Sequence, residues 1–232
     1  MKKIVAITSF CFFFGALLNA QSSDLRLGFQ VSPSFSFMAT DDNQINSNGT
    51  NLGLKLGMIA EMYFQENYAF FTGLGFAFNS GGTLRHEQGG QIWTRSELPQ
   101  GVNPTFFTGV DLKYNIQYVE IPFGLKFRTN SFGYLRYWAE IPVLTLGFRS
   151  QARGAIMQPG TNKDKIIIKK EVGALALSWG LGGGVEYELS PNASLVGGIN
   201  YQRIFTDVTR DVSDDDSKGY PSHIILRIGV MF

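Results

Sequence analysis

Residues 25–37, LRLGFQVSPSFSF, alternate strictly between two kinds of side chain. Leucine, phenylalanine, valine and proline occupy the odd positions, whereas arginine, glycine, glutamine and serine occupy the even ones. Because successive side chains of a β-strand point to opposite faces, this period of two predicts an extended strand with one apolar and one polar face. Either a soluble sheet over a protein core or a membrane barrel facing lipid could impose that contrast.

The same alternation recurs along the chain and predicts further strands. Residues 52–64, for example, place Leu54 on an apolar face and Lys55 on a polar one. Two of the strands lose phase near Tyr118 and near Pro142, where we expect bulges. In all, eight strands are predicted, over residues 25–37, 52–64, 69–79, 112–128, 134–149, 172–189, 193–208 and 220–232.

Short and long connections alternate between these strands. An up-and-down barrel in an outer membrane has this organisation, with tight periplasmic turns and extended outer loops. A soluble sandwich has no reason to sort its loops by length, so the sequence predicts an all-β fold, an eight-stranded antiparallel transmembrane β-barrel with both termini periplasmic. The short connections are 65–68, 129–133 and 190–192, and the long ones are 38–51, 80–111, 150–171 and 209–219.

The N-terminus has the features of a secretory signal. Lys2 and Lys3 precede an apolar run over residues 4–18, and the small Ala20 follows. We therefore expect a signal peptide over residues 1–20 and a barrel domain over 21–232. A membrane anchor is the weaker interpretation, because the run is shorter than the roughly 20 residues that a spanning helix needs. Cys11 is the only cysteine, so the mature chain would lack disulfides and thiol nucleophiles.

The C-terminus and the net charge also bear on the class of protein. The last strand ends on Phe232, on the same face as Ile228 and Val230. This terminal aromatic resembles the signal that barrel-assembly machinery reads in bacterial outer-membrane proteins, although a core aromatic at the end of a strand is the alternative. The formal net charge is +1, so no basic excess points to a nucleic-acid partner.

The polar faces of the strands would line the lumen. Eight strands enclose a space that side chains fill, so we expect a plug of ion pairs and no diffusion pore. A hairpin centred near Asn130 and Ser131 would put Glu120 roughly opposite Glu140 and Lys126 roughly opposite Arg136, and like charges that face each other destabilise a sheet. We therefore expect their partners across the lumen or on other strands. The predicted inward charges are Lys55, Glu61, Glu120, Lys126, Arg128, Arg136, Glu140, Glu186, Glu188 and Arg227.

Enzymatic alternatives rest on few residues. Glu120 and Glu140 could share a proton for acid–base work. Ser222 and His223 could begin a lipid-hydrolase triad, but adjacent residues on a strand point to opposite faces. His86 and His223 lie too far apart in sequence to suggest a metal site. The sequence therefore predicts a protein without catalytic, cofactor-binding or metal-binding residues.

Four further segments carry recognisable features. The glycines of 180–184 would make room for large inward neighbours or allow a bend. The basic segment 161–171 could touch lipid phosphates or extend the strand of residues 172–189 above the membrane. Phe106 and Phe107 in the longest loop would form a partner-contact patch or pack over the barrel mouth. An acidic loop could bind divalent ions, but its spacing departs from that of calcium loops, so a solvated loop is preferred; its aspartates are Asp207, Asp211, Asp214, Asp215 and Asp216.

The stretch YNIQYVEIPFGLKFRTN, residues 114–130, resembles the PorT-like outer-membrane β-barrel family of the Bacteroidetes. Val119 stands where the family usually has leucine, and residues 140–142 repeat the Glu-Ile-Pro unit of 120–122. The signal peptide, the short turns and the terminal aromatic also agree with that family, so the resemblance spans the mature chain. The residues that carry the motif are Tyr118, Glu120, Ile121, Pro122, Leu125 and Lys126.

The resemblance implies an integral protein of the cell outer membrane. The name-giving member of the family is linked to the type IX secretion system, which exports proteins across the outer membrane. Our leading hypothesis is thus a non-enzymatic barrel that docks secretion or gliding components. The alternatives are an enzyme that modifies lipid or lipopolysaccharide, and a narrow passive channel. The expected partners are outer-membrane lipid and lipopolysaccharide, the barrel-assembly machinery and secretion-system proteins.

Overall fold

The computed structural model describes residues 25–99, 102, 105–210 and 217–232. The expected signal peptide, residues 1–20, lies outside the described residues. In the described part, no helix has the length and hydropathy that crossing a membrane would require.

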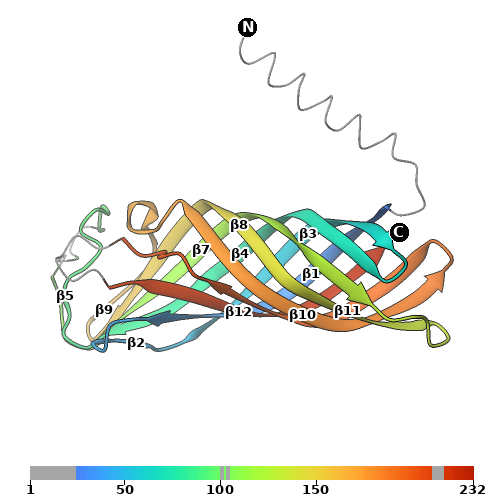
Figure 1. The fold of residues 1–232 in the computed structure, drawn as a ribbon. Helices are drawn as coiled ribbons and strands as arrows, with labels where there is room; N and C mark the ends of the chain where they lie inside the picture. The colour runs from blue at the N-terminus through green and yellow to red at the C-terminus, as the bar shows by residue number, and fades with distance from the viewer. Residues whose placement is uncertain (1–24, 100–101, 103–104, 211–216) are drawn as a thin grey trace, which may run out of the picture.

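Eight long antiparallel strands form a closed barrel (Figure 1), which confirms the predicted fold class. Each strand pairs with the next, and the sheet closes where β1 meets β12. Closure gives every long strand a hydrogen-bonded neighbour on both sides. The backbone N–H and C=O groups need these neighbours because lipid cannot form hydrogen bonds with them. The long strands are β1 (Leu25–Thr40), β3 (Thr50–Gln65), β4 (Tyr68–His86), β7 (Val110–Arg128), β8 (Leu135–Gln158), β10 (Leu175–Ser190), β11 (Ala193–Ile204) and β12 (Gly219–Met231).

Shorter elements lie at one end of this barrel. At the opposite end, which also holds the C-terminus, short turns join β3 to β4, β7 to β8 and β10 to β11 (Figure 1). Phe232 completes the seam there, because Leu27 and Phe232 exchange backbone N–H···O hydrogen bonds of 2.7 and 3.2 Å. The shorter elements are β2 (Ile45–Ser47), β5 (Gly90–Gln91), β6 (Thr105–Phe106), β9 (Thr161–Ile167) and the 3-10 turn η1 (Lys169–Glu171).

Exposure along β1 follows the alternation of its sequence. Leu27 and Phe29 are 50% and 57% exposed, whereas Ser34 and Ser36 are buried in the lumen. Large apolar side chains are exposed in the same way on the other long strands. A belt of apolar side chains therefore surrounds the part of the barrel that contains the short turns.

The strands are longer than a membrane requires. β7 has 19 residues and β8 has 24, whereas a transmembrane strand needs about 9–11. β4, β7 and β8 continue past the apolar belt, and together with β2, β9 and η1 they form what we call the outer extension. Two predicted strands were too short, because β4 runs to His86 and β8 to Gln158. The strand predicted from residue 172 started too early, because β10 begins at Leu175.

The two faces of β7 exchange their polarity near Tyr118. Beyond this residue, in the outer extension, Leu112 and Ile116 are fully buried in the interior, and the opposite face carries polar residues such as Lys113 and Gln117. Toward the short turns, the interior receives Glu120, Lys126 and Arg128. Water thus surrounds the outer extension, and lipid surrounds the remainder.

Bulges occur beside Tyr118, as expected, but they are not in β7 itself. The alternation of β7 continues through Tyr118, and the extra residues belong to the neighbouring strands. Phe78 and Asn79 of β4 stand opposite Gln117 alone, and Ser150 is the additional residue in β8. The bulge expected near Pro142 is confirmed, because Ile141 and Pro142 together stand opposite Leu125 of β7.

An apolar core fills the interior of the outer extension. Trp93, 3% exposed, enters it from the connection between β4 and β7. Its Nε1 donates to the Tyr114 hydroxyl at 3.0 Å, and the two rings meet edge to face. Phe106 is buried in this core, whereas Phe107 is 67% exposed. Of the two roles predicted for this pair, Phe106 thus takes the packing role, and Phe107 remains on the surface. The fully buried core residues include Met38, Leu84, Leu112, Ile116, Ile156, Ile168 and Val208.

Candidate functional site: the charged lumen and its cover

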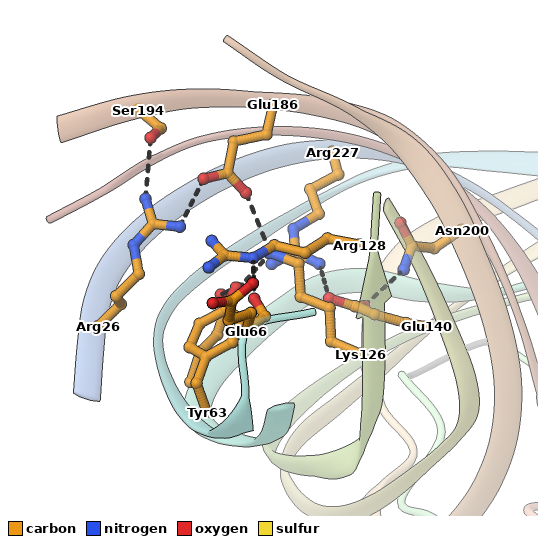
Figure 2. Close-up of polar contacts among 11 residues, drawn as sticks. Arg26, Tyr63, Glu66, Lys126, Arg128, Glu140, Glu186, Ser194, Asn200 and Arg227 are labelled. Atoms are coloured by element: carbon orange, nitrogen blue, oxygen red, sulfur yellow. Dashed lines mark hydrogen bonds and ion pairs between the residues drawn. The ribbon is translucent and has the colours of Figure 1, made fainter. Parts of the chain in front are cut away.

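Lys126 forms the centre of a buried ionic cluster in the lumen (Figure 2). Its Nζ lies 2.6 Å from Glu61 Oε1 and 3.5 Å from Glu186 Oε2, and these side chains are 0–3% exposed. Tyr63 donates its hydroxyl proton to Glu61 Oε2 at 2.8 Å. The cluster joins β3, β7 and β10, strands that are not all neighbours in the sheet.

Arg26 belongs to this cluster, although it is absent from the predicted set of inward charges. Its Nη1 lies 2.5 Å from Glu186 Oε1, and its Nη2 donates to Ser194 Oγ at 2.9 Å (Figure 2). Its place between Leu25 and Leu27 in the alternating stretch was the signal that could have identified it. Glu186 is therefore held between Lys126 and Arg26.

A second group of pairs lies nearer the outer extension. Lys55 Nζ lies 2.9 Å from both carboxylate oxygens of Glu120 and also donates to Gln202 at 2.5 Å. Arg227 of β12 donates to Glu140 of β8. Each glutamate thus has its own cation on a strand that does not adjoin it, which is the kind of partner the sequence predicts.

The predicted cross-strand register was wrong. Glu120 stands opposite Gly147, and Lys126 stands opposite Glu140. The hairpin pairs are centred on Gly133, further along the chain than predicted, and the bulge at Ile141 and Pro142 adds one more residue to β8. Since Glu120 and Glu140 each pair with a separate cation, the geometry gives no support to a carboxylate pair that shares one proton.

Three of the predicted inward charges lie at the rim beside the short turns. Arg136 and Glu188 are 3.9 Å apart with side chains 32% and 39% exposed. Arg128 stacks on the Tyr63 ring at 4.0 Å and donates its Nε to the Glu66 carbonyl. The exposed Arg136–Glu188 pair contributes little to stability, whereas Arg128 covers Tyr63 on the solvent side of the plug.

Little open space remains between these layers. A cavity of about 70 Å³ borders Lys55, Glu120, Glu140 and Arg227, enough for a few water molecules. The apolar core of the outer extension lies beyond it. The space between these two layers is therefore filled by side chains, and the cavity within it is smaller than a substrate of ordinary size.

The histidines do not form a common site. His223 lies in the lumen, 1% exposed, whereas His86 ends β4 in the outer extension. Burial lowers the pKa of His86 to about 4, and the nearby Asp42 carboxylate opposes this shift only in part. Among the residues with described positions, no three His, Cys, Asp or Glu side chains gather as a metal site.

The glycines of 180–184 were predicted to make room for large neighbours, and Gly182 and Gly198, which pairs with Gly184, test this prediction. A Cβ at Gly182 would lie 2.3 Å from the Asn200 side chain, and one at Gly198 would lie 2.4 Å from the Trp138 ring. The small residues therefore do make room for large inward neighbours.

The structure describes the basic segment 161–171 and one aspartate of the acidic loop. Asp207 Oδ1 accepts hydrogen bonds from the backbone N–H groups of Thr209 and Gly219, so it braces the base of its loop; Asp211, Asp214, Asp215 and Asp216 lie outside the described residues. In the basic segment 161–171, β9 pairs with β8 beyond the part that pairs with β10. The segment thus extends the sheet, but η1 separates β9 from β10, so it does not continue that strand.

A closed antiparallel barrel with an apolar belt and a filled lumen defines an integral outer-membrane β-barrel protein. Residues 19–209 match the family model described as outer membrane protein beta-barrel domain. The chain belongs to this family of outer-membrane proteins.

Solved structures of outer-membrane proteins resemble this fold at low sequence identity. Neisserial surface protein A matches at 13% identity and a TM-score of 0.46, over 88% of this chain and 95% of that one. OprG from Pseudomonas aeruginosa matches at 9% identity and a TM-score of 0.43, over 90% and 95%. A major outer membrane protein from Thermus thermophilus matches at 14% identity and a TM-score of 0.41, over 89% and 98%. A comparison with curated protein sequences gave no match.

Proposed function

We propose that this protein is a non-enzymatic docking component of the outer membrane that works through its outer extension and loops. One observation carries the proposal: the lumen holds ion pairs and an apolar core, while β4, β7 and β8 continue beyond the apolar belt. A filled lumen leaves the outer surface as the place where a partner can bind. Phe107, 67% exposed beside the buried Phe106, gives that surface an apolar contact.

The PorT-like motif supports a role in type IX secretion or gliding only through family resemblance. Glu120 and Lys126 of the motif both form lumen ion pairs, so their chemistry serves the barrel and does not recognise a partner. We therefore expect the partner specificity to reside in the outer loops.

The proposed orientation places both termini and the short turns in the periplasm. The clustering of the short turns beside the C-terminus supports it (Figure 1). The barrel-assembly machinery would read the terminal Phe232 during insertion, and the pairing of this residue with Leu27 at the seam is consistent with that role.

A deletion strain provides the test of the docking role. We expect deletion to reduce secreted proteins and surface motility, and wild-type protein to restore both. Phe107→Ser should fail to restore them and should lose partners in pull-downs from gently solubilised membranes. Phe132→Ser is a matched control, because Phe132 is 65% exposed in the turn between β7 and β8, at the opposite end. Unchanged secretion and motility after deletion, together with no recovered partner, would refute the proposal.

A further inference from the structure

A strongly basic pocket opens on the outer extension, beside η1 and the end of β9. Its volume is about 980 Å³. Among the described lining residues, Glu97 is the one acidic side chain. Such an excess of one charge predicts an anionic ligand. The cationic lining residues are Arg95, Arg149, Lys165, Lys169, Lys170 and Arg210.

Local backbone features present these cations to the pocket. Asp164 and Lys165 of β9 both stand opposite Ala155 of β8, and this bulge redirects the side chains that follow it. Lys165 adopts a φ of 60°, a left-handed conformation that is uncommon for a residue other than glycine. Arg149 donates to the carbonyls of Lys169 and Val172, which holds the lysine-bearing turn η1 against β8.

The pocket lies directly beyond the apolar belt. Phe148, on the face of β8 opposite to that of Arg149, is 47% exposed and pairs with Leu175, which is 45% exposed, so this apolar pair borders the pocket from the lipid side. Ile167 lines the pocket and is 70% exposed. An apolar side chain among lysines at the edge of the hydrocarbon matches an amphiphile with a phosphate head and acyl chains. A free anion would use the charges but gives no role to Ile167.

We propose that this pocket binds the phosphate groups of a phosphorylated glycolipid of the outer leaflet, of the lipopolysaccharide class. Ammonium and guanidinium groups form strong charge-assisted hydrogen bonds with phosphate oxygens. The acyl chains of the same lipid would lie along Phe148 and Leu175. The site rests on the proposed orientation, which puts the outer extension outside the cell, and it does not depend on the docking role.

Lipid binding to the purified, folded barrel in detergent tests the site. We would measure the affinity by native mass spectrometry for lipid A with both phosphates, for fully dephosphorylated lipid A and for inorganic pyrophosphate. Lys169→Gln/Lys170→Gln should weaken binding of the diphosphorylated lipid by about tenfold. The matched control Lys113→Gln/Lys163→Gln removes two lysines of the outer extension that do not line the pocket. It should change the affinity by less than about twofold.

Three outcomes bear on the proposal. Dephosphorylated lipid A should bind the wild-type barrel no better than diphosphorylated lipid A binds the Lys169→Gln/Lys170→Gln variant. Equal losses in the two double variants would overturn the site, since general surface charge would then explain binding. Pyrophosphate binding as tight as that of the lipid would also overturn it, because the ligand would then be a free anion. A heat-dependent shift in electrophoretic mobility verifies that each variant is folded.

Discussion

Lys126 shows at the scale of one residue how the lumen is stabilised. Its ammonium group neutralises Glu61 and Glu186 where water has little access. Lys126→Met would leave Glu61 buried without a cation. Because an unpaired buried charge is costly, we expect the free energy of unfolding to fall by about 3–5 kcal/mol, measured by urea titration in lipid vesicles.

Arg136→Met is the control for this variant. The Arg136–Glu188 pair is 3.9 Å long and about a third exposed, so its loss should cost less than about 1 kcal/mol. Similar losses in the two variants would contradict the central role of Lys126.

Adjacent glycines on β11 offer a second comparison. A Cβ at Gly198 would lie 2.4 Å from the Trp138 ring and 2.5 Å from the Gly183 carbonyl oxygen, whereas a Cβ at Gly197 meets nothing within 4 Å. We expect Gly198→Ala to lower the free energy of unfolding by about 1–3 kcal/mol and Gly197→Ala to leave it nearly unchanged or slightly raised. A urea titration that ranks them in the opposite order would show that Trp138 packs elsewhere.

The inward charges were largely predictable at this scale, but their partners were not. Alternation identified Lys55, Glu61 and Lys126 as inward, and the same rule applies to Arg26. The partners depended on the registers of several strands; that of β7 and β8, for example, is set by a turn centred on Gly133 and by one extra residue at the bulge of Ile141 and Pro142. A bulge can be expected from proline, but the number of residues it inserts cannot.

At the scale of the element, β7 spans two solvents. Its odd-numbered residues share the outer face, yet Lys113 lies beyond the apolar belt and Ile121 lies within it. The sequence suggested a loss of phase at Tyr118 because the polarity of the two faces exchanges there. In the sequence, the passage of β7 from lipid to water thus looks the same as a bulge that shifts its alternation.

Cysteine labelling tests this boundary, since Cys11 in the expected signal peptide is the only native cysteine. We expect Lys113→Cys in intact cells to react with a membrane-impermeant maleimide, because its outer face meets water. Ile121→Cys on the same face should stay unlabelled in lipid. Equal labelling of the two positions would contradict both the boundary and the proposed orientation.

The end of β4 should make the outer extension sensitive to acid. Burial lowers the pKa of His86 to about 4, below its ordinary value of about 6.5. Between these values the unfolded chain binds more protons than the folded one, so stability falls as the pH drops from 6.5 toward 4. The urea midpoint of unfolding, followed by tryptophan fluorescence, should therefore decrease over this range. His86→Gln should reduce the decrease, and an unchanged pH dependence in that variant would assign it to other groups.

At the scale of the whole molecule, two kinds of side-chain packing fill the interior of the barrel. Ion pairs fill the lumen within the membrane, and the apolar core with Trp93 fills the outer extension. We expect no discrete conductance steps when the purified protein is inserted into planar bilayers. A porin inserted in the same bilayers serves as the positive control. Reproducible steps from the wild-type protein would contradict the filled lumen and favour the passive-channel alternative.

The period of two, the sorted connections and the even strand number were enough to specify the closed barrel, because each depends on local alternation and on the needs of a backbone in lipid. Tertiary structure alone decided which charges meet. Lys126 and Glu61 are 65 positions apart in sequence, and Arg26 and Glu186 are 160 apart. Their contact depends on the curvature, register and bulges of strands that do not adjoin. Tertiary structure also assembled the basic pocket, since Arg95, Lys169 and Arg210 come from three connections that meet only when the barrel has closed.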